Sequence, residues 1–130
     1  MVVDTSVLVA VLEDESIAAR LSAALDAAEA VRVSVVTLVE AGIVVETRRG
    51  ELAGHELDLL LSRLQADIVS VTRDHAALAR DAYRRFGKGH HRAGLNFGDC
   101  FSYALAVAVG ESLLFVGNDF ANTDVLAAQY

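Results

Sequence analysis

The chain lacks several features that would mark particular classes of protein. Its single cysteine excludes an internal disulfide bond and is typical of a reducing compartment. Its longest apolar stretches, such as 103–109, fall well short of the roughly 20 residues that a membrane-spanning helix needs. The amino terminus has no basic region of the kind found in signal peptides, and Asp4 interrupts its first apolar run. These absences predict a cytoplasmic protein with no membrane segment.

Internal repeats, linkers and low-complexity tracts are also missing, so nothing in the sequence argues for a second domain. The 130 residues are enough for one domain with a real core, and hydrophobic residues make up 54% of them. We therefore expect one folded domain over residues 1–130.

Basic residues are scarce, and the net charge is -7. Taken alone, this charge argues against a nucleic-acid partner, because basic surface drives phosphate binding. The distribution weakens the objection, since residues 73–92 hold six of the 11 basic residues and only two acids. This segment, which includes Arg85 and Arg92, is either a solvated helix face or a phosphate-binding surface.

Short apolar segments alternate with segments of helical periodicity along the whole chain. This alternation predicts an α/β fold with a parallel sheet of four to five strands, covered by helices on both faces. The expected strands are 2–3, 31–36, 68–71 and 113–116, with 125–126 as a candidate fifth. The expected helices are 5–13, 15–30, 37–49, 54–66, 74–86 and 98–109.

Four acidic residues lie at or just after the ends of apolar segments: Asp4, Glu40, Asp99 and Asp119. Ligands of parallel α/β sheets bind outside the carboxyl ends of the strands, so these acids are expected to converge there. Clustered carboxylates suit hard cations such as Mg²⁺ and Mn²⁺, which can activate water and offset charge on a phosphodiester. The pattern indicates metal-dependent hydrolysis.

Each acid also has a purely structural interpretation. Asp4 can cap the helix that follows it, and Glu40 stands three residues after Thr37, the spacing of a capping box. Asp99 lies at the positive end of a helix, and Asp119 suits a turn. These alternatives stay open on residue pattern alone.

Other reactive side chains near these positions have simpler explanations. Ser6 can bond a carboxylate or a metal-bound water, although helix capping is the commoner role of such a serine. Cys100, on an apolar helix, is expected to be a core residue. The adjacent His90 and His91 share no face and lack a third soft ligand, so surface or substrate contact is expected.

Four segments of the chain resemble the PIN-domain ribonucleases, and more narrowly the VapC toxins of type II toxin–antitoxin systems. The resemblance spans essentially the whole chain, and the Asn-Phe-Gly-Asp-Cys run is its most specific part. The segments are Val-Val-Asp-Thr-Ser at 2–6, Thr-Leu-Val-Glu at 37–40, the run from Leu95 to Ala106, and Leu114 to Phe120 with Thr123 and Asp124.

The resemblance implies a PIN-like three-layer α/β/α fold and a Mg²⁺- or Mn²⁺-dependent endoribonuclease. It also implies a homodimer and neutralisation by a cognate VapB-type antitoxin. By motif, Asp4 and Asp99 match the principal metal ligands, and Glu40 matches a third acid that binds metal or positions water.

The fourth acid departs from the family pattern, because Gly117-Asn118-Asp119-Phe120 offers an acid only at the later of two usual places. We assign the fourth acid to Asp119, and Asp124 is the alternative. Ser6 and Asn96 match polar positions around the site, while Arg85 and Arg92 are predicted RNA contacts on charge alone.

Three other functions compete with this one. A signalling receiver domain needs paired acids after the first strand and a lysine after a late strand, whereas the single lysine here is Lys88. A phosphohydrolase with an aspartate nucleophile would have an acid where Ser6 stands. A catalytically inactive interaction module of the same fold stays open. The helices at 37–66 carry Leu38, Ile43, Val44, Leu57, Leu60 and Leu61, which predicts apolar surface for a dimer.

Overall fold

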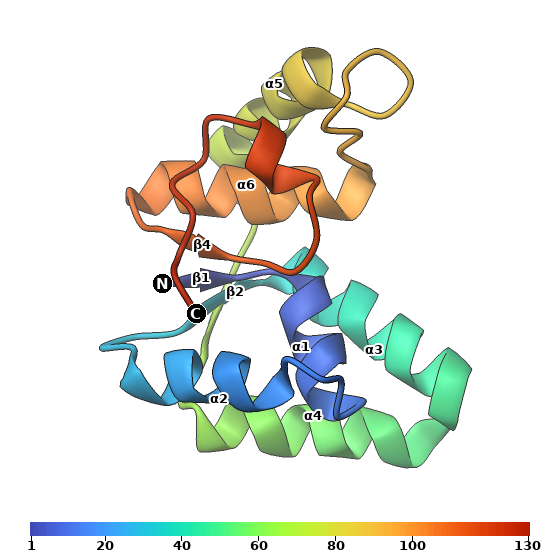
Figure 1. Ribbon diagram of the computed structural model, residues 1–130. Coiled ribbons are helices and arrows are strands. Elements are labelled where there is room, and N and C mark those ends of the chain that lie inside the picture. Colours follow the sequence, from blue (N-terminus) through green and yellow to red (C-terminus); the bar gives the residue numbers. More distant parts are fainter.

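The computed structural model describes all 130 residues and has a four-stranded parallel sheet at its centre (Figure 1). The strands are β1 (Val2–Val3), β2 (Arg32–Ser34), β3 (Asp67–Val69) and β4 (Leu113–Leu114), in the order β3-β2-β1-β4. The predicted parallel sheet is confirmed, although β2, β3 and β4 are shorter than expected. The candidate fifth strand is reduced to one parallel bridge between Leu113 and Ala127.

Six α-helices and one short 3₁₀ helix connect and cover the strands, and none combines the length and apolar character needed to cross a membrane. Their bounds are α1 (Thr5–Leu12), α2 (Ala18–Ala27), α3 (Val35–Arg49), α4 (Glu51–Arg63), α5 (Arg73–Phe86), α6 (Phe97–Val109) and η1 (Phe120–Asn122).

The sheet separates two hydrophobic clusters, which makes a three-layer α/β/α arrangement. Helices α5 and α6 lie on one side in Figure 1, and α1, α2 and α4 lie on the other. Neighbouring strand residues face opposite layers, as the pleat requires: Val2 and Leu113 pack with α5 and α6, whereas Val3 and Leu114 pack with α1 to α4. The expected fold class is confirmed.

Helix α3 begins earlier than the sequence suggested. Ser34, at the end of β2, caps it by accepting a hydrogen bond from the Val36 N–H, so Thr37 lies inside the helix. The predicted capping box between Thr37 and Glu40 is therefore wrong, because an upstream serine already provides the cap. Gly50, with φ of +87°, ends α3 and directly precedes α4, a backbone angle that favours glycine.

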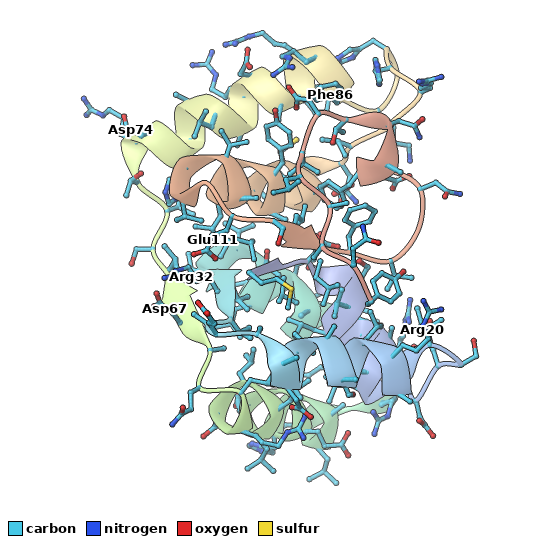
Figure 2. All side chains as sticks on the ribbon, turned by 60° about the vertical axis from the view of Figure 1, so that its left-hand side comes forward. Arg20, Arg32, Asp67, Asp74, Phe86 and Glu111 are labelled. Atoms are coloured by element: carbon cyan, nitrogen blue, oxygen red, sulfur yellow. The ribbon has the colours of Figure 1, made fainter.

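Charged side chains gather at the edge of the sheet opposite the strands' carboxyl ends. Arg32 of β2 pairs with Glu111, which lies just before β4, and its Nε lies 3.9 Å from Asp67 of β3 (Figure 2). This edge is ion-paired, whereas the carboxyl edge gathers unpaired acids.

Candidate active site

The acidic residues meet at the point where the strand order reverses. From β1 the chain adds β2 and β3 on one side, whereas β4 lies on the other side of β1. The carboxyl ends of β1 and β4 therefore form the switch point at which such sheets bind ligands. A cavity of about 350 Å³ opens there, and Asp4, Ser6, Glu40, Asn96 and Asp99 line it.

Asp4 follows β1 directly and is only 3% exposed. Its Oδ2 accepts hydrogen bonds from the Ser6 N–H (3.0 Å) and the Ser6 hydroxyl (2.7 Å), and its Oδ1 accepts one from the Ser102 hydroxyl (2.7 Å). Asp4 is therefore the cap of α1, which confirms the structural interpretation of this acid, and its carboxylate also lines the cavity.

Ser6 also joins the two strands of the switch point. Its Oγ accepts a 3.0 Å hydrogen bond from the Val116 N–H, just beyond β4, while it donates to Asp4. Ser6 thus makes the hydrogen bond to a carboxylate that its sequence position allowed, and it holds Asp4 against the end of β4.

Glu40 projects from α3 toward α1 and α6. Its Oε1 accepts a hydrogen bond from the Thr5 hydroxyl, and its carboxylate lies against Gly98 of α6. A Cβ built at Gly98 would stand 2.0 Å from Glu40 Oε2, so any larger residue there would displace the glutamate. The glycine of the Asn-Phe-Gly-Asp run thus makes room for the carboxylate of another helix.

Asp99 is held by a capping box at the start of α6. The Asn96 side chain accepts from the Asp99 N–H, and Asp99 Oδ2 accepts from the Asn96 N–H, both at 2.9 Å. This reciprocal pair fixes one oxygen of Asp99 and leaves Oδ1 without a protein donor. The Asn-x-x-Asp spacing was visible in the sequence and could have revealed the box.

The four acids are close enough for the charges of three of them to raise the pKa of the fourth, Asp99. Burial raises the pKa of Asp99 to about 7, against the opposing effect of the Asn96 backbone hydrogen bond. The negative charges of Asp4, Asp119 and Glu40, in that order, add to the rise. The one cation that lines the cavity, Arg48, has its guanidinium 2.8 Å from Glu13. No basic side chain is free to neutralise the acids.

The two candidates for the fourth acid have different surroundings. Asp119 is exposed, its side chain makes no hydrogen bond, and its charge acts on Asp99. Asp124 instead accepts from the Tyr103 hydroxyl (2.6 Å) and from Arg85, and these two hydrogen bonds lower its pKa. Asp124 thus anchors the carboxy-terminal segment to α5 and α6 and is absent from the acidic cavity.

The remaining predicted residues lie around the site rather than in it. Arg85 is engaged by Asp124 and lies 3.6 Å from Asp81, whereas Arg92 is exposed in the loop before α6. His90 contacts the last carbonyls of α5 through Nε2, and His91 Nδ1 accepts from the Ala93 N–H. Cys100 is buried, as expected, and burial raises its pKa to about 11.

The donor set suits a hard divalent cation. Glu40 Oε2, Asp99 Oδ1 and both oxygens of Asp119 accept no hydrogen bond within the protein. As the side chains stand, no three acidic, histidine or cysteine residues are arranged to hold one metal ion. One or two carboxylates with several waters are nevertheless the usual Mg²⁺ set, and Asp99 and Asp4 supply such a pair.

Two hydroxyl residues of the site did not emerge from the sequence as site residues. Ser102 and Thr37 are both fully buried, and their hydroxyls lie 3.1 Å apart. Ser102 stands three residues after Asp99, one helical turn along α6, and this spacing was the available signal. The position of Thr37 opposite Ser102 could not be read from the sequence, because it depends on how α3 packs against α6.

Comparison with known proteins finds relatives that span nearly the whole chain. The model of the PIN domain family matches residues 1–126. Ribonuclease VapC30 of Mycobacterium tuberculosis is 53% identical over 125 residues, covering 96% of this chain and 95% of that protein.

Solved structures share the fold at low sequence identity. The crystal structure of M. tuberculosis VapC20, described as a sarcin-ricin loop cleaving toxin, has a TM-score of 0.81 and 18% identity, covering 99% of this chain and 98% of that one. A chain of a toxin–antitoxin complex from Klebsiella pneumoniae has a TM-score of 0.74 and 18% identity, covering 99% and 97%.

Proposed function

We propose, since this chain belongs to the PIN-domain family and within it to the VapC ribonucleases, that it is a metal-dependent endoribonuclease that acts as the toxin of a toxin–antitoxin pair. The observation that carries the proposal is the convergence of Asp4, Glu40 and Asp99 on one cavity without a free cation, with the charge of Asp119 close enough to act on Asp99. The 53% identity to a protein named a ribonuclease supports the substrate class.

Asp4 and Asp99 are the residues that would hold Mg²⁺ or Mn²⁺, with Glu40 and Asp119 beside them. When bound, the cation would lower the pKa of water and offset charge on the phosphodiester. Binding is expected to displace the proton that Asp99 retains near neutral pH, because the cation favours the ionised carboxylate.

The protein's own residues supply orientation. Ser6 and Ser102 hold the two oxygens of Asp4, so this carboxylate cannot rotate away from the cavity. Thr5 holds one oxygen of Glu40 and leaves Oε2 free to accept a proton from a water molecule. This arrangement fits Glu40 as the group that positions the attacking water, and Asp119 as the outer wall of the site.

A partner surface separate from the cavity is consistent with an antitoxin and with a homodimer. Large apolar side chains on α3 and α4 are exposed: Val39, Ile43, Leu52 and Leu59. The set expected from the sequence was partly wrong, because Leu57, Leu60 and Leu61 are buried in the core. At about 10 µM, a concentration above a dissociation constant of about 1 µM, the protein should sediment as a dimer. A monomer would count against self-association.

The decisive experiment compares the parent with Asp99→Asn in a cleavage assay on RNA with added Mg²⁺ or Mn²⁺. The substitution keeps the side-chain oxygen of the capping box, so the fold should persist while cleavage is lost. Asp74→Asn, an exposed acid in the first turn of α5, is the matched control. If Asp99→Asn cut RNA like the parent after identical purification, the assignment would fail.

One competing function has an observation behind it. The absence of a ready three-residue metal arrangement, together with the exposed apolar face of α3 and α4, also suits a catalytically inactive interaction module. Calorimetric titration with Mn²⁺ separates the two, because the enzyme should bind the ion and lose that binding in Asp99→Asn.

A further inference from the structure

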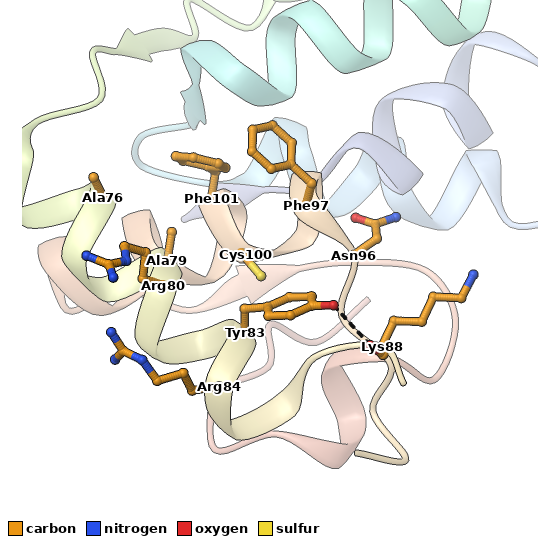
Figure 3. Close-up of a pocket in the computed structure, with 10 residues that line it drawn as sticks. All are labelled: Ala76, Ala79, Arg80, Tyr83, Arg84, Lys88, Asn96, Phe97, Cys100 and Phe101. Atoms are coloured by element: carbon orange, nitrogen blue, oxygen red, sulfur yellow. Dashed lines mark hydrogen bonds between the residues drawn. The ribbon is translucent and has the colours of Figure 1, made fainter. Parts of the chain in front are cut away.

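A second and larger cavity, of about 710 Å³, lies in the groove between α5 and the first half of α6 (Figure 3). Apolar and aromatic side chains form much of its lining, and three basic residues complete it. Asn96, the cap of α6, lines both this groove and the acidic cavity. The two hollows are therefore neighbours on one surface.

The groove carries positive charge in a chain whose net charge is -7. Its basic residues are Arg80, Arg84 and Lys88, and no acidic residue lines it. Arg80 and Lys88 have no acidic partner within ion-pair distance, and Arg84 lies 3.6 Å from Asp81. Unpaired cations beside an acidic site favour a polyanionic occupant.

The groove also presents aromatic rings that the structure holds in place. The Tyr83 hydroxyl donates a 3.1 Å hydrogen bond to the Lys88 carbonyl, and a Cβ at Gly87 would lie 2.8 Å from the Tyr83 ring (Figure 3). Phe97 is 73% exposed and packs edge-on against Phe101, with ring centroids 5.0 Å apart. Exposed rings beside cations are the surface on which single-stranded nucleic acids stack their bases.

The position of Phe97 links the groove to the chemistry. Phe97 is the first residue of α6 and lies in the same helical turn as Asp99. We propose that the groove binds the single-stranded RNA segment adjoining the scissile phosphodiester, with a base stacked on Phe97 or Tyr83 and phosphates near Arg80 and Lys88. This inference rests on the proposed ribonuclease function and assigns that site a flanking-nucleotide subsite.

Single-stranded RNA fits the groove better than a duplex or a protein does. Stacking on a side chain requires bases that are not already stacked within a helix, which excludes paired RNA. A second copy of this chain would cover the apolar rings, but a protein surface lacks the regular row of negative charges with which an RNA backbone can pair with Arg80, Arg84 and Lys88. The test below discriminates between these occupants.

Binding is measured on the Asp99→Asn background, so that the RNA stays intact. Fluorescence anisotropy reports the affinity of a labelled single-stranded RNA oligonucleotide of mixed sequence over a range of salt concentrations. Arg80→Ala and Lys88→Ala should each reduce the slope of log affinity against log salt by about 0.7. Phe97→Ala should weaken binding about tenfold or more while leaving that slope unchanged.

Matched controls lie outside both cavities. Arg73→Ala removes the same charge from the first turn of α5, and Leu126→Ala removes an exposed apolar side chain near the carboxy terminus. Both should bind RNA like the Asp99→Asn parent. The same oligonucleotide annealed to its complement should bind without sensitivity to Phe97→Ala.

Photo-cross-linking with 4-thiouridine in the oligonucleotide locates the RNA directly. Cross-links on peptides that contain Tyr83, Phe97 or Phe101 are expected, and cross-links confined to other surfaces would overturn the proposal. If Phe97→Ala instead converts a sedimenting dimer to a monomer and leaves RNA affinity unchanged, a second copy occupies the groove. If groove variants bind and cut RNA normally while Asp99→Asn does not cut, the subsite is wrong and the ribonuclease assignment stands.

Discussion

The Ser102 hydroxyl donates a 2.7 Å hydrogen bond to Asp4 Oδ1, which ties the middle of α6 to the end of β1. Ser102 is fully buried and also contacts the Thr37 hydroxyl at 3.1 Å. A single serine therefore connects α3, α6 and the first acidic residue of the site. Because Asp4 is itself buried, the orientation of its carboxylate depends on this contact.

Removal of the serine hydroxyl should affect both stability and the site. Ser102→Ala leaves Asp4 Oδ1 and the Thr37 hydroxyl without a buried partner, so the free energy of unfolding should fall by about 1–2 kcal/mol. Mn²⁺ affinity and cleavage rate should fall too, because Ser6 alone then holds the Asp4 carboxylate. Urea unfolding and calorimetry measure the two effects. Ser62→Ala, an exposed serine on α4, should change neither; equal behaviour of the two variants would remove Ser102 from the site.

Substitution of Gly98 tests the room that Glu40 occupies. Gly98→Ala places a Cβ 2.0 Å from Glu40 Oε2, so Glu40 must move and cleavage should fall at least tenfold. That expected loss corresponds to about 1.4 kcal/mol of transition-state stabilisation. Gly42→Ala in α3, where a Cβ meets nothing within 4 Å, should raise stability by about 0.5–1 kcal/mol and keep activity. Wild-type cleavage by Gly98→Ala would show that Glu40 has no catalytic part.

Stability without metal should depend on pH through Asp99. Its pKa rises from 3.8 to about 7 in the folded protein, so the folded state binds the proton more tightly than the unfolded chain does. Stability should therefore fall as pH rises from about 4 to about 7, and level off above that range. Thermal unfolding in a chelating buffer measures this change, and Asp99→Asn should flatten the curve. An unchanged slope in the variant would assign the effect to another group.

Asp119 and Asp124 should respond differently to substitution. Asp119→Asn should lower cleavage with little change in stability, since its side chain makes no hydrogen bond. Asp124→Asn should weaken the contacts with Arg85 and Tyr103 and lower the unfolding midpoint. Tyr103→Phe should lose about 1 kcal/mol of stability through the same cluster. Cleavage per folded molecule, measured for all three, decides which acid completes the site.

The sequence predicted helices well where the residues at their boundaries give a clear signal. The helix at 74–86 was predicted within one residue of α5, and Gly110 ends α6 in the left-handed conformation that favours glycine. Errors occurred where a neighbouring residue competed for the same role. Ser34 rather than Thr37 caps α3, and Asp4 rather than Ser6 caps α1. Ser34 is the last residue of β2 and stands three positions before the predicted helix, whereas Asp4 directly follows β1 and stands one position before it.

The candidate site was predictable only in part. Acids after strands of a parallel sheet must lie along one edge, so the placement of Asp4 near the end of β4 follows from topology. The sequence did not show which carboxylate oxygens accept hydrogen bonds or which hydroxyls donate them. These contacts depend on how α3 packs against α6. The capping interpretation of Glu40 was rejected for the same reason, because its carboxylate reaches Thr5 and Gly98 across the cavity.

The sequence by itself determined the α/β class, the family and the four acids, because strand–helix alternation and short motifs are properties of local order along the chain. The tertiary structure alone decided how those acids are distinguished. It buries Asp4 under Ser102, engages Asp124 with Arg85 and Tyr103, and leaves Asp119 free. It also opens the basic aromatic groove beside Asp99. These differences arise from contacts between segments that are distant in the sequence. Local sequence patterns do not predict such contacts.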